Sequence, residues 1–293
     1  MASSASRRAR LAPRPGRPLG QVTRGKTAPN RLRKTDTFLA VAYPELVRHM
    51  PGLYIDLGYG AYPVTSVETL RRLRPLNPQL CVLGVEIDPQ RVADAQPYVE
   101  DGLAFRLGGF NLPLAPGETA SVIRAFNVLR QYDEPKVENA LAALCASLTP
   151  GGLILEGTSD PLGRLLTFNV YRKQAAGTLE RVALVLAPTL RAGFLPRQFQ
   201  AVLPKNFIHH AEPGGPIDRF FAAWHAAWQQ ARSAVGPAGP RAVFYRAALR
   251  LASHYGYGLD RRPALLRRGF LCLGAAWPET QPRLKDEPNG QAP

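Results

Sequence analysis

The spacing of apolar and polar residues divides the middle of the chain into short strands separated by helices. Apolar runs that predict strands lie at Leu53–Leu57, Leu80–Ile87, Leu103–Leu107, Ser121–Asn127 and Leu153–Leu155. Helical periodicity predicts helices over Thr35–Met50, over Val64–Arg74 and from Asp133 to a Thr-Pro-Gly-Gly turn. Strands that alternate with helices build a parallel sheet with right-handed crossovers, so an α/β fold with a mostly parallel sheet is expected.

The pattern changes after residue 160. Arg164–Arg172 and Leu179–Ala187 alternate apolar and polar residues around Gly177, which predicts an antiparallel hairpin at the sheet edge. Apolar stripes between residues 196 and 256 predict a mainly helical addition, and Gly269–Ala276 predicts one last strand. The expected organisation is a disordered basic arm at 1–30, a sheet domain at 31–187, a helical addition at 188–277 and a disordered tail at 278–293.

Composition limits the classes of protein to consider. Apolar residues make up 45% of the 293 residues, which is enough for a sizeable core. No apolar run approaches the ~18–20 residues of a membrane helix, and none follows the basic start, so neither a membrane span nor a signal peptide is expected. Cys81, Cys145 and Cys272 lie far apart in apolar segments, which is typical of buried thiols in a cytoplasmic protein.

Acidic and amide side chains recur where the predicted strands end. Four of the strands end in Asp56, Glu86, Asn127 and Glu156. The carboxyl ends of parallel strands meet at one edge of the sheet, where such folds bind their ligands. We therefore expect these side chains to border one binding site.

Two glycines after the first strand allow a ligand to approach the backbone closely. In the dinucleotide-binding fingerprint G-x-G-x-x-G, counted from Gly58 through Gly60, the third glycine would fall on Pro63. Asp56 precedes the first glycine, and its negative charge is a poor neighbour for phosphate but a good one for an ammonium or sulfonium cation. The loop therefore favours a cationic ligand over a dinucleotide.

The stretch IDLGYG resembles the D-x-G-x-G motif of class I S-adenosylmethionine (SAM)-dependent methyltransferases. The stretches VLGVEIDPQRVADA, NVLRQY and LTPGG resemble the same superfamily in the same order, over roughly residues 50–160. PNRLRKTD, RAFNVLRQYDE and GGLILEGTSD also resemble a bacterial subfamily within it. The resemblance implies a Rossmann-like fold, with residues 31–187 as the methyltransferase-like domain and SAM as the cofactor.

Roles for the cofactor-binding residues follow from the resemblance. It implies that Asp56 lies near the methionine end of SAM, where Gly58 and Gly60 let the backbone approach. It also implies that Glu86 accepts hydrogen bonds from both ribose hydroxyls. Adenine would pack on Phe110 and bond Asn111, although the acid usual in the family at this point is missing.

The sequence also offers candidate residues for the side of the site where the methyl acceptor would bind. Asn127, Tyr132 and Glu156 are candidate catalytic residues, although the first two could equally brace the loop that follows the fourth strand. A general base could come from Glu156, Thr158 or Asp160. Arg124 lies mid-strand and would cost several kcal/mol if buried unpaired, so we expect it to pair with Glu156. No metal site is expected, and His209 and His210 are interpreted as structural.

The predicted function is a SAM-dependent methyltransferase that acts on an oxygen or nitrogen of a small molecule or RNA. Methyl transfer depends mainly on in-line positioning and exclusion of water, so no catalytic signature is required. Two alternatives stay open: a non-catalytic SAM- or nucleic-acid-binding protein on the same fold, and an NAD-dependent oxidoreductase.

The start of the chain is strongly basic. Residues 1–35 carry ten basic residues and no acidic one, within a net charge of +15. The segment is either a solubilising extension or a cationic arm that adds nonspecific nucleic-acid affinity by releasing counterions. In the second case residues 1–25 are dispensable for folding, and Asn30–Asp36 pack over the SAM pocket with Arg31 or Arg33 facing the acceptor.

Overall fold

The structure is a computed structural model and describes residues 17–190, 193–208, 211–236 and 239–278. His209, His210, most of the expected tail and the first 16 residues of the expected arm lie outside the described residues. The chain forms two compact units. Unit 1 comprises the described residues up to Glu156 together with Tyr171–Glu180, and unit 2 comprises Gly157–Val170 and the described residues from Arg181 onward.

The strands have the order β3-β2-β1-β4-β5-β6-β7-β8. The first five strands along the chain are β1 Leu53–Leu57, β2 Val82–Glu86, β3 Leu103–Leu107, β4 Ala120–Phe126 and β5 Leu148–Ser159. The pairs β1–β2, β1–β4 and β2–β3 are parallel, which confirms the expected mostly parallel, Rossmann-like sheet. Strand β1 lies between β2 and β4, so the strand order reverses beside it, where such sheets bind ligands.

The helices of unit 1 follow the predicted periodicity. They are α1 Arg33–Ala42, α2 Pro44–Arg48, α3 Val64–Leu73, α4 Pro89–Ala95 and α5 Glu134–Ala146, with short 3-10 turns at Gln96–Tyr98 and Leu129–Gln131. Asp88 caps α4 as expected, because its side chain accepts hydrogen bonds from the backbone N–H groups of Gln90 and Arg91. Ile55, Val85, Ile123 and Leu144 are among the buried residues of the core that joins this sheet to its helices.

One predicted boundary is wrong. Strand β5 begins at Leu148 and includes the Thr-Pro-Gly-Gly stretch that was expected to be a turn. Gly151 takes a φ of 77°, a left-handed conformation that glycine adopts without strain, so the ladder continues through the sequence signal for a break.

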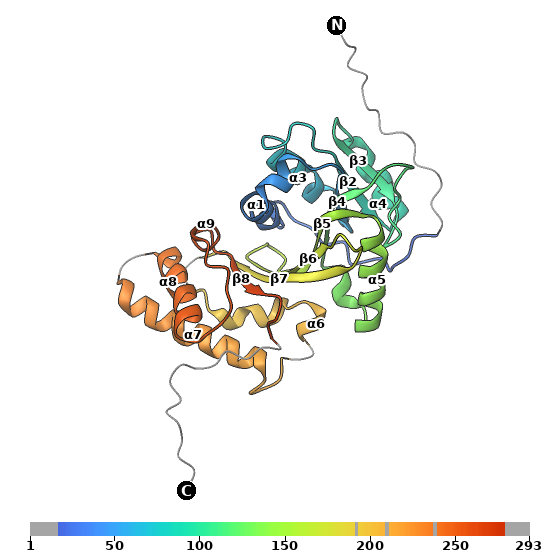
Figure 1. Cartoon of the computed structure of the whole chain (residues 1–293). Helices are drawn as coiled ribbons and strands as arrows, with labels where there is room; N and C mark the ends of the chain where they lie inside the picture. The colour runs from blue at the N-terminus through green and yellow to red at the C-terminus, as the bar shows by residue number, and fades with distance from the viewer. Residues whose placement is uncertain (1–16, 191–192, 209–210, 237–238, 279–293) are drawn as a thin grey trace. The chain divides into compact units, whose positions relative to one another are not determined.

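Helices and a 3-10 turn make up most of the elements of unit 2. It contains most of the hairpin strands β6 Leu165–Lys173 and β7 Leu179–Pro188, and β8 Leu271–Gly274 pairs antiparallel with β7. The other elements are η3 Pro196–Val202, α6 Lys205–Ile208, α7 Pro216–Val235, α8 Pro240–Ser253 and α9 Pro263–Leu266. Helices α7 and α8 lie side by side around an aromatic core (Figure 1).

Trp224 of α7 lies at the centre of that core. It is completely buried and packs with Phe199, Phe220 and Phe244 at centroid distances of 5.5, 5.7 and 6.1 Å. Aromatic pairs at these distances contribute beyond their buried area. The unit therefore depends on this side chain for packing.

We predict that Trp224→Ala lowers the free energy of unfolding of unit 2 by about 3–5 kcal/mol, because the indole leaves a cavity that the core fills only in part. The three tryptophans all lie in unit 2, so urea unfolding followed by the fluorescence of the remaining two reports on this unit. Arg232→Ala, at an exposed position on the same helix, is the control. A loss below about 1 kcal/mol for Trp224→Ala would contradict the packing role.

Candidate cofactor-binding site at the carboxyl ends of β1, β2 and β3

Asp56, near the end of β1, is held by Arg124 of β4. The two residues are register partners in the parallel pair, and the arginine Nε and Nη2 lie 3.0 and 2.9 Å from the two carboxylate oxygens. The hydroxyls of Thr65 and Ser66 in the first turn of α3 also donate to Asp56, at 2.7 and 2.8 Å. The carboxylate is 2% exposed, so these internal partners engage it fully.

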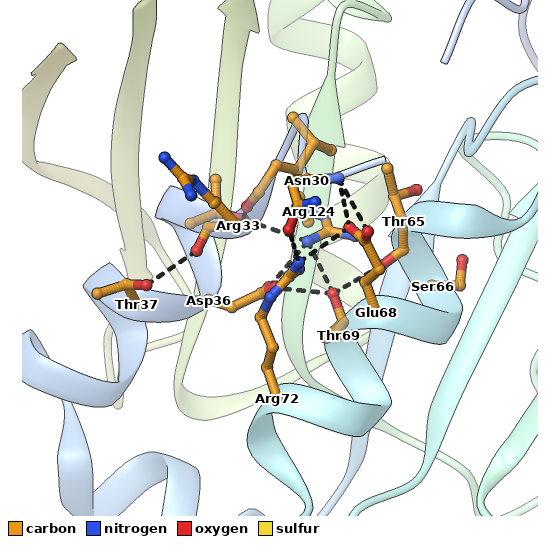
Figure 2. A network of polar contacts seen from close by, with 12 residues as sticks. Asn30, Arg33, Asp36, Thr37, Thr65, Ser66, Glu68, Thr69, Arg72 and Arg124 are labelled. Carbon is orange, nitrogen blue, oxygen red and sulfur yellow. Dashed lines mark hydrogen bonds and ion pairs between the residues drawn. The ribbon is translucent and has the colours of Figure 1, made fainter. Parts of the chain in front are cut away.

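A second carboxylate shares the same arginine (Figure 2). Nη1 of Arg124 lies 2.9 Å from Oδ1 of Asp36 in α1 and 2.8 Å from the hydroxyl of Thr69 in α3. Arg72 of α3 contacts the other oxygen of Asp36 at 3.1 Å. One buried cation thus joins two strands and two helices around the start of the glycine loop.

Burial and charge act in opposite directions in this cluster. Burial raises the pKa of Asp36, whereas the guanidinium groups of Arg124 and Arg72 pull that pKa down. Burial also disfavours the charge of Arg124, but Asp56 and the other neighbouring groups outweigh it and raise the arginine pKa above its usual value. Arginine stays protonated in proteins, and these neighbours favour its charged form here.

These contacts correct one expectation and change another. The predicted pairing of Arg124 with Glu156 is wrong, because Asp56 stands beside Arg124 on the adjacent strand β1 and Asp36 meets it from α1. The structural role expected for Arg124 is present with these other partners. Asp56, expected near the methionine end of a cofactor, has its carboxylate directed into the protein interior.

Glu86 fixes the second half of the glycine loop. Its Oε2 accepts a hydrogen bond from the backbone N–H of Gly60 at 3.0 Å, and its Oε1 accepts one from Ile87 at 2.9 Å. Gly58 and Gly60 have φ values of 71° and 91°, a region that favours glycine. Arg91 of α4 lies 3.6 Å from Glu86, whose side chain is only 1% exposed. The acid and the loop predicted to act together are therefore in contact.

Phe110 and Tyr132 form an aromatic pair after β3 and β4. Their rings pack edge to face with centroids 5.4 Å apart, so a predicted catalytic residue stands beside a predicted adenine-binding residue. Asn127 follows β4 directly with a φ of 60°, which Asn tolerates better than most residues. Glu156 is buried in β5, the neighbour of β4.

Sequence reasoning missed the segment Arg17–Lys26, which we call the N-terminal strap. The backbone of Leu19 pairs with the residues after β3: its carbonyl accepts from the N–H of Phe110 at 2.8 Å, and its N–H donates to Oδ1 of Asn111 at 2.7 Å. The strap continues past Tyr132, whose hydroxyl accepts a hydrogen bond from the N–H of Gln21.

Farther along, the strap reaches Arg91 and the glycine loop. Arg91 donates to the carbonyl of Thr23 at 2.9 Å, and the N–H of Ala61 donates to the carbonyl of Gly25 at 2.8 Å. Polar and glycine-rich sequences of this kind offer no apolar periodicity, and these contacts use the strap's backbone. No pattern of side chains could therefore have indicated where the segment lies.

The segment expected to pack over the pocket, Asn30–Asp36, contacts α3 instead. The N–H of Asn30 donates to the carboxylate of Glu68 at 2.8 Å, and Asp36 belongs to the Arg124 cluster. Arg31 donates to the carbonyl of Lys26. The strap, nearer the N-terminus, contacts the glycine loop and the residues after β3.

Asp160, a possible general base by sequence, lines a pocket of about 370 Å³ in unit 2 and accepts hydrogen bonds from the backbone N–H groups of Arg164 and Leu165. Within the described ranges, no cluster of side chains suits a metal ion. No helix in that part of the chain has the length and apolar character needed to cross a bilayer.

No model of a protein family matches the sequence, and no curated protein matches it. Among solved structures, the chain is similar to the CMeT domain of the citrinin polyketide synthase, with 20% identity, a TM-score of 0.35 and coverage of 43% of this chain and 34% of that one. It is also similar to the plantazolicin methyltransferase BpumL, at 16% identity, TM-score 0.34 and coverage of 44% and 46%.

A third similar structure is the N-methyltransferase NodS from Bradyrhizobium japonicum WM9, at 15% identity, TM-score 0.30 and coverage of 43% and 66%. The chain spans less than two thirds of the length of each of these proteins. BpumL and NodS are named as methyltransferases, and each of the three likenesses covers under half of this chain.

We predict that Arg124→Met destabilises unit 1 by about 3–5 kcal/mol, because it leaves two buried carboxylates without their cation. The measurement is urea unfolding followed by far-UV circular dichroism, with tryptophan fluorescence reporting unit 2 separately. The triple variant Arg124→Met/Asp36→Asn/Asp56→Asn, which removes the charges together, is expected to recover part of the loss. Equal stability of Arg124→Met and the parent would contradict the role of this cluster.

Proposed function

We propose that unit 1 binds SAM at the carboxyl ends of β1, β2 and β3 and transfers its methyl group to an oxygen or nitrogen acceptor. The observation that carries this proposal is Glu86, a buried carboxylate bonded to the N–H of Gly60 in a loop with two left-handed glycines. An acid fixed at the end of β2 beside such a loop suits two vicinal hydroxyls of a ribose. The motif resemblance over residues 50–160 supports the same assignment.

The residues fit the nucleoside part of SAM. Oε2 of Glu86 accepts one hydrogen bond, from the N–H of Gly60, and a carboxylate oxygen can accept two, whereas Oε1 already accepts from the N–H groups of Ile87 and Asp88. The N–H of Phe110 and Oδ1 of Asn111 offer a donor beside an acceptor, which complements the acceptor and donor that adenine presents on one edge. The rings of Phe110 and Tyr132 supply an apolar wall next to them.

For the amino-acid end of SAM, the proposed contacts differ from those expected from the sequence. Asp56 is engaged by Arg124, Thr65 and Ser66, so it acts as a positioning residue that fixes β1 and α3 on either side of the loop. In this proposal the ammonium is held by backbone carbonyls of the loop, and not by the Asp56 carboxylate.

SAM supplies a methyl group that is already activated on a sulfonium. What the chain has to add is in-line positioning of the acceptor and exclusion of water. Asn127 and Glu156 are proposed to border the acceptor, and Glu156 is the candidate base for an acceptor of low acidity. For Tyr132, contact with Phe110 favours a place at the nucleoside end over one beside the reacting methyl group.

The acceptor class is a small molecule or RNA, and methyl-labelled SAM distinguishes these. We expect label in an RNA fraction or in a small-molecule fraction after incubation with the protein. Tight SAM binding without transfer to either would support the non-catalytic alternative. Tighter binding of NAD than of SAM would support the oxidoreductase alternative.

We predict that the full chain binds one SAM per molecule and that Glu86→Ala weakens binding by about 1.5–3 kcal/mol, as for hydrogen bonds to a charged group. Isothermal titration calorimetry measures both quantities. Glu45→Ala, which removes an exposed carboxylate on α2, is the matched control and should leave the affinity unchanged. Unaltered SAM affinity in a folded Glu86→Ala protein would refute the site.

A further inference from the structure

We propose that the N-terminal strap, Arg17–Lys26, is an autoinhibitory segment that competes with the adenosyl group of SAM for the site in unit 1. This inference rests on the proposed function. The strap contacts residues after β3, after β4, in α4 and in the glycine loop, all of which border the carboxyl ends of the strands. It therefore follows the path that an extended nucleoside ligand would take.

At one end, Leu19 uses the groups that would recognise adenine. Its carbonyl accepts from the N–H of Phe110, and its N–H donates to the side-chain oxygen of Asn111. Adenine presents the same combination, a ring-nitrogen acceptor beside an exocyclic amine donor. The peptide backbone thus satisfies both groups, and adenine cannot bond them while the strap is docked.

The backbone of the strap lies directly against Gly109 and Gly60, which line the proposed site. A Cβ added at Gly109 would stand 2.0 Å from the carbonyl oxygen of Leu19, and one at Gly60 would stand 2.7 Å from that of Gly25. With the two backbones this close, no ligand fits between the strap and the residues that line the site. A lid that covers bound SAM would need room for SAM beneath it. The geometry therefore indicates that the strap and SAM compete for the same space.

Few side chains anchor the strap. Leu19 and Val22, its two large apolar residues, are each 55% exposed, and most of its hydrogen bonds to the site come from its backbone. Segments with little buried apolar surface open at low free energy. The strap can therefore leave without unfolding of unit 1, and the docked fraction sets how much SAM affinity is lost.

The test compares two substitutions at one position in the full chain. Leu19→Pro removes the N–H that bonds Asn111, because proline has no backbone donor. Leu19→Ala keeps that N–H and removes only the exposed side chain. By calorimetry we expect Leu19→Pro to bind SAM about tenfold or more tightly than the parent, since apparent affinity scales with the open fraction. Leu19→Ala should match the parent.

Truncations give an independent measurement. Removal of residues 1–24 should tighten SAM binding as Leu19→Pro does, whereas removal of residues 1–16 should leave it unchanged. Equal SAM affinity in the parent, in Leu19→Pro and in the 1–24 truncation would refute the competitive role of the strap and leave the proposed function standing. Weaker SAM binding in Leu19→Pro and in the 1–24 truncation would refute it in the same way. An equal gain in both truncations would also overturn it. Absence of SAM binding in every variant would overturn the proposed function itself.

Discussion

The buried guanidinium of Arg124 is the interaction on which the arrangement of unit 1 depends. It is completely inaccessible to solvent and bonds Asp56 of β1 and Asp36 of α1, and it also donates to the hydroxyls of Thr35 in α1 and Thr69 in α3. Desolvating such a cluster is expensive, so it contributes little stability relative to an apolar core of the same shape. What it provides is specificity. Any shift of β4 against β1, or of either helix, leaves a charge unpaired in the interior, and the backbone that leads into the glycine loop is thereby held in one position.

That constraint also changes what the site can do. An acid before a glycine loop is expected to face a ligand, but here it is used to position α3 and β1, and Glu86 becomes the carboxylate available at the strand ends. The remaining recognition groups, the N–H of Phe110 and the side chain of Asn111, belong to the segment after β3 and are already bonded to Leu19. In the proposed function these groups form the nucleoside half of the site, and the backbone of Leu19 bonds two of them.

The sequence was sufficient for the elements that depend on local pattern. The short apolar strands, the Asp88 cap and the helical stripes of α5 and α7 are all where periodicity and turn chemistry predict them, because each is decided within a few residues. Strand β5 differs at its start because Gly151 takes a left-handed conformation inside the strand and does not end it. The partners of Arg124 could not be predicted either. Asp56 and Glu156 were both available on neighbouring strands, and the second partner, Asp36, lies 88 residues away in sequence. The strap was missed because its contacts are made mainly by backbone groups, which every residue carries.

The most direct test of this account is amide hydrogen exchange at Leu19 and Phe110, measured with and without S-adenosylhomocysteine, the product of methyl transfer from SAM. The account predicts that the N–H of Leu19 is protected in the free protein and exchanges faster when the site is saturated, because the strap is displaced. The N–H of Phe110 should stay protected in both states, since adenine replaces the carbonyl of Leu19 as its acceptor. Protection of Leu19 that persists at saturation would contradict the account.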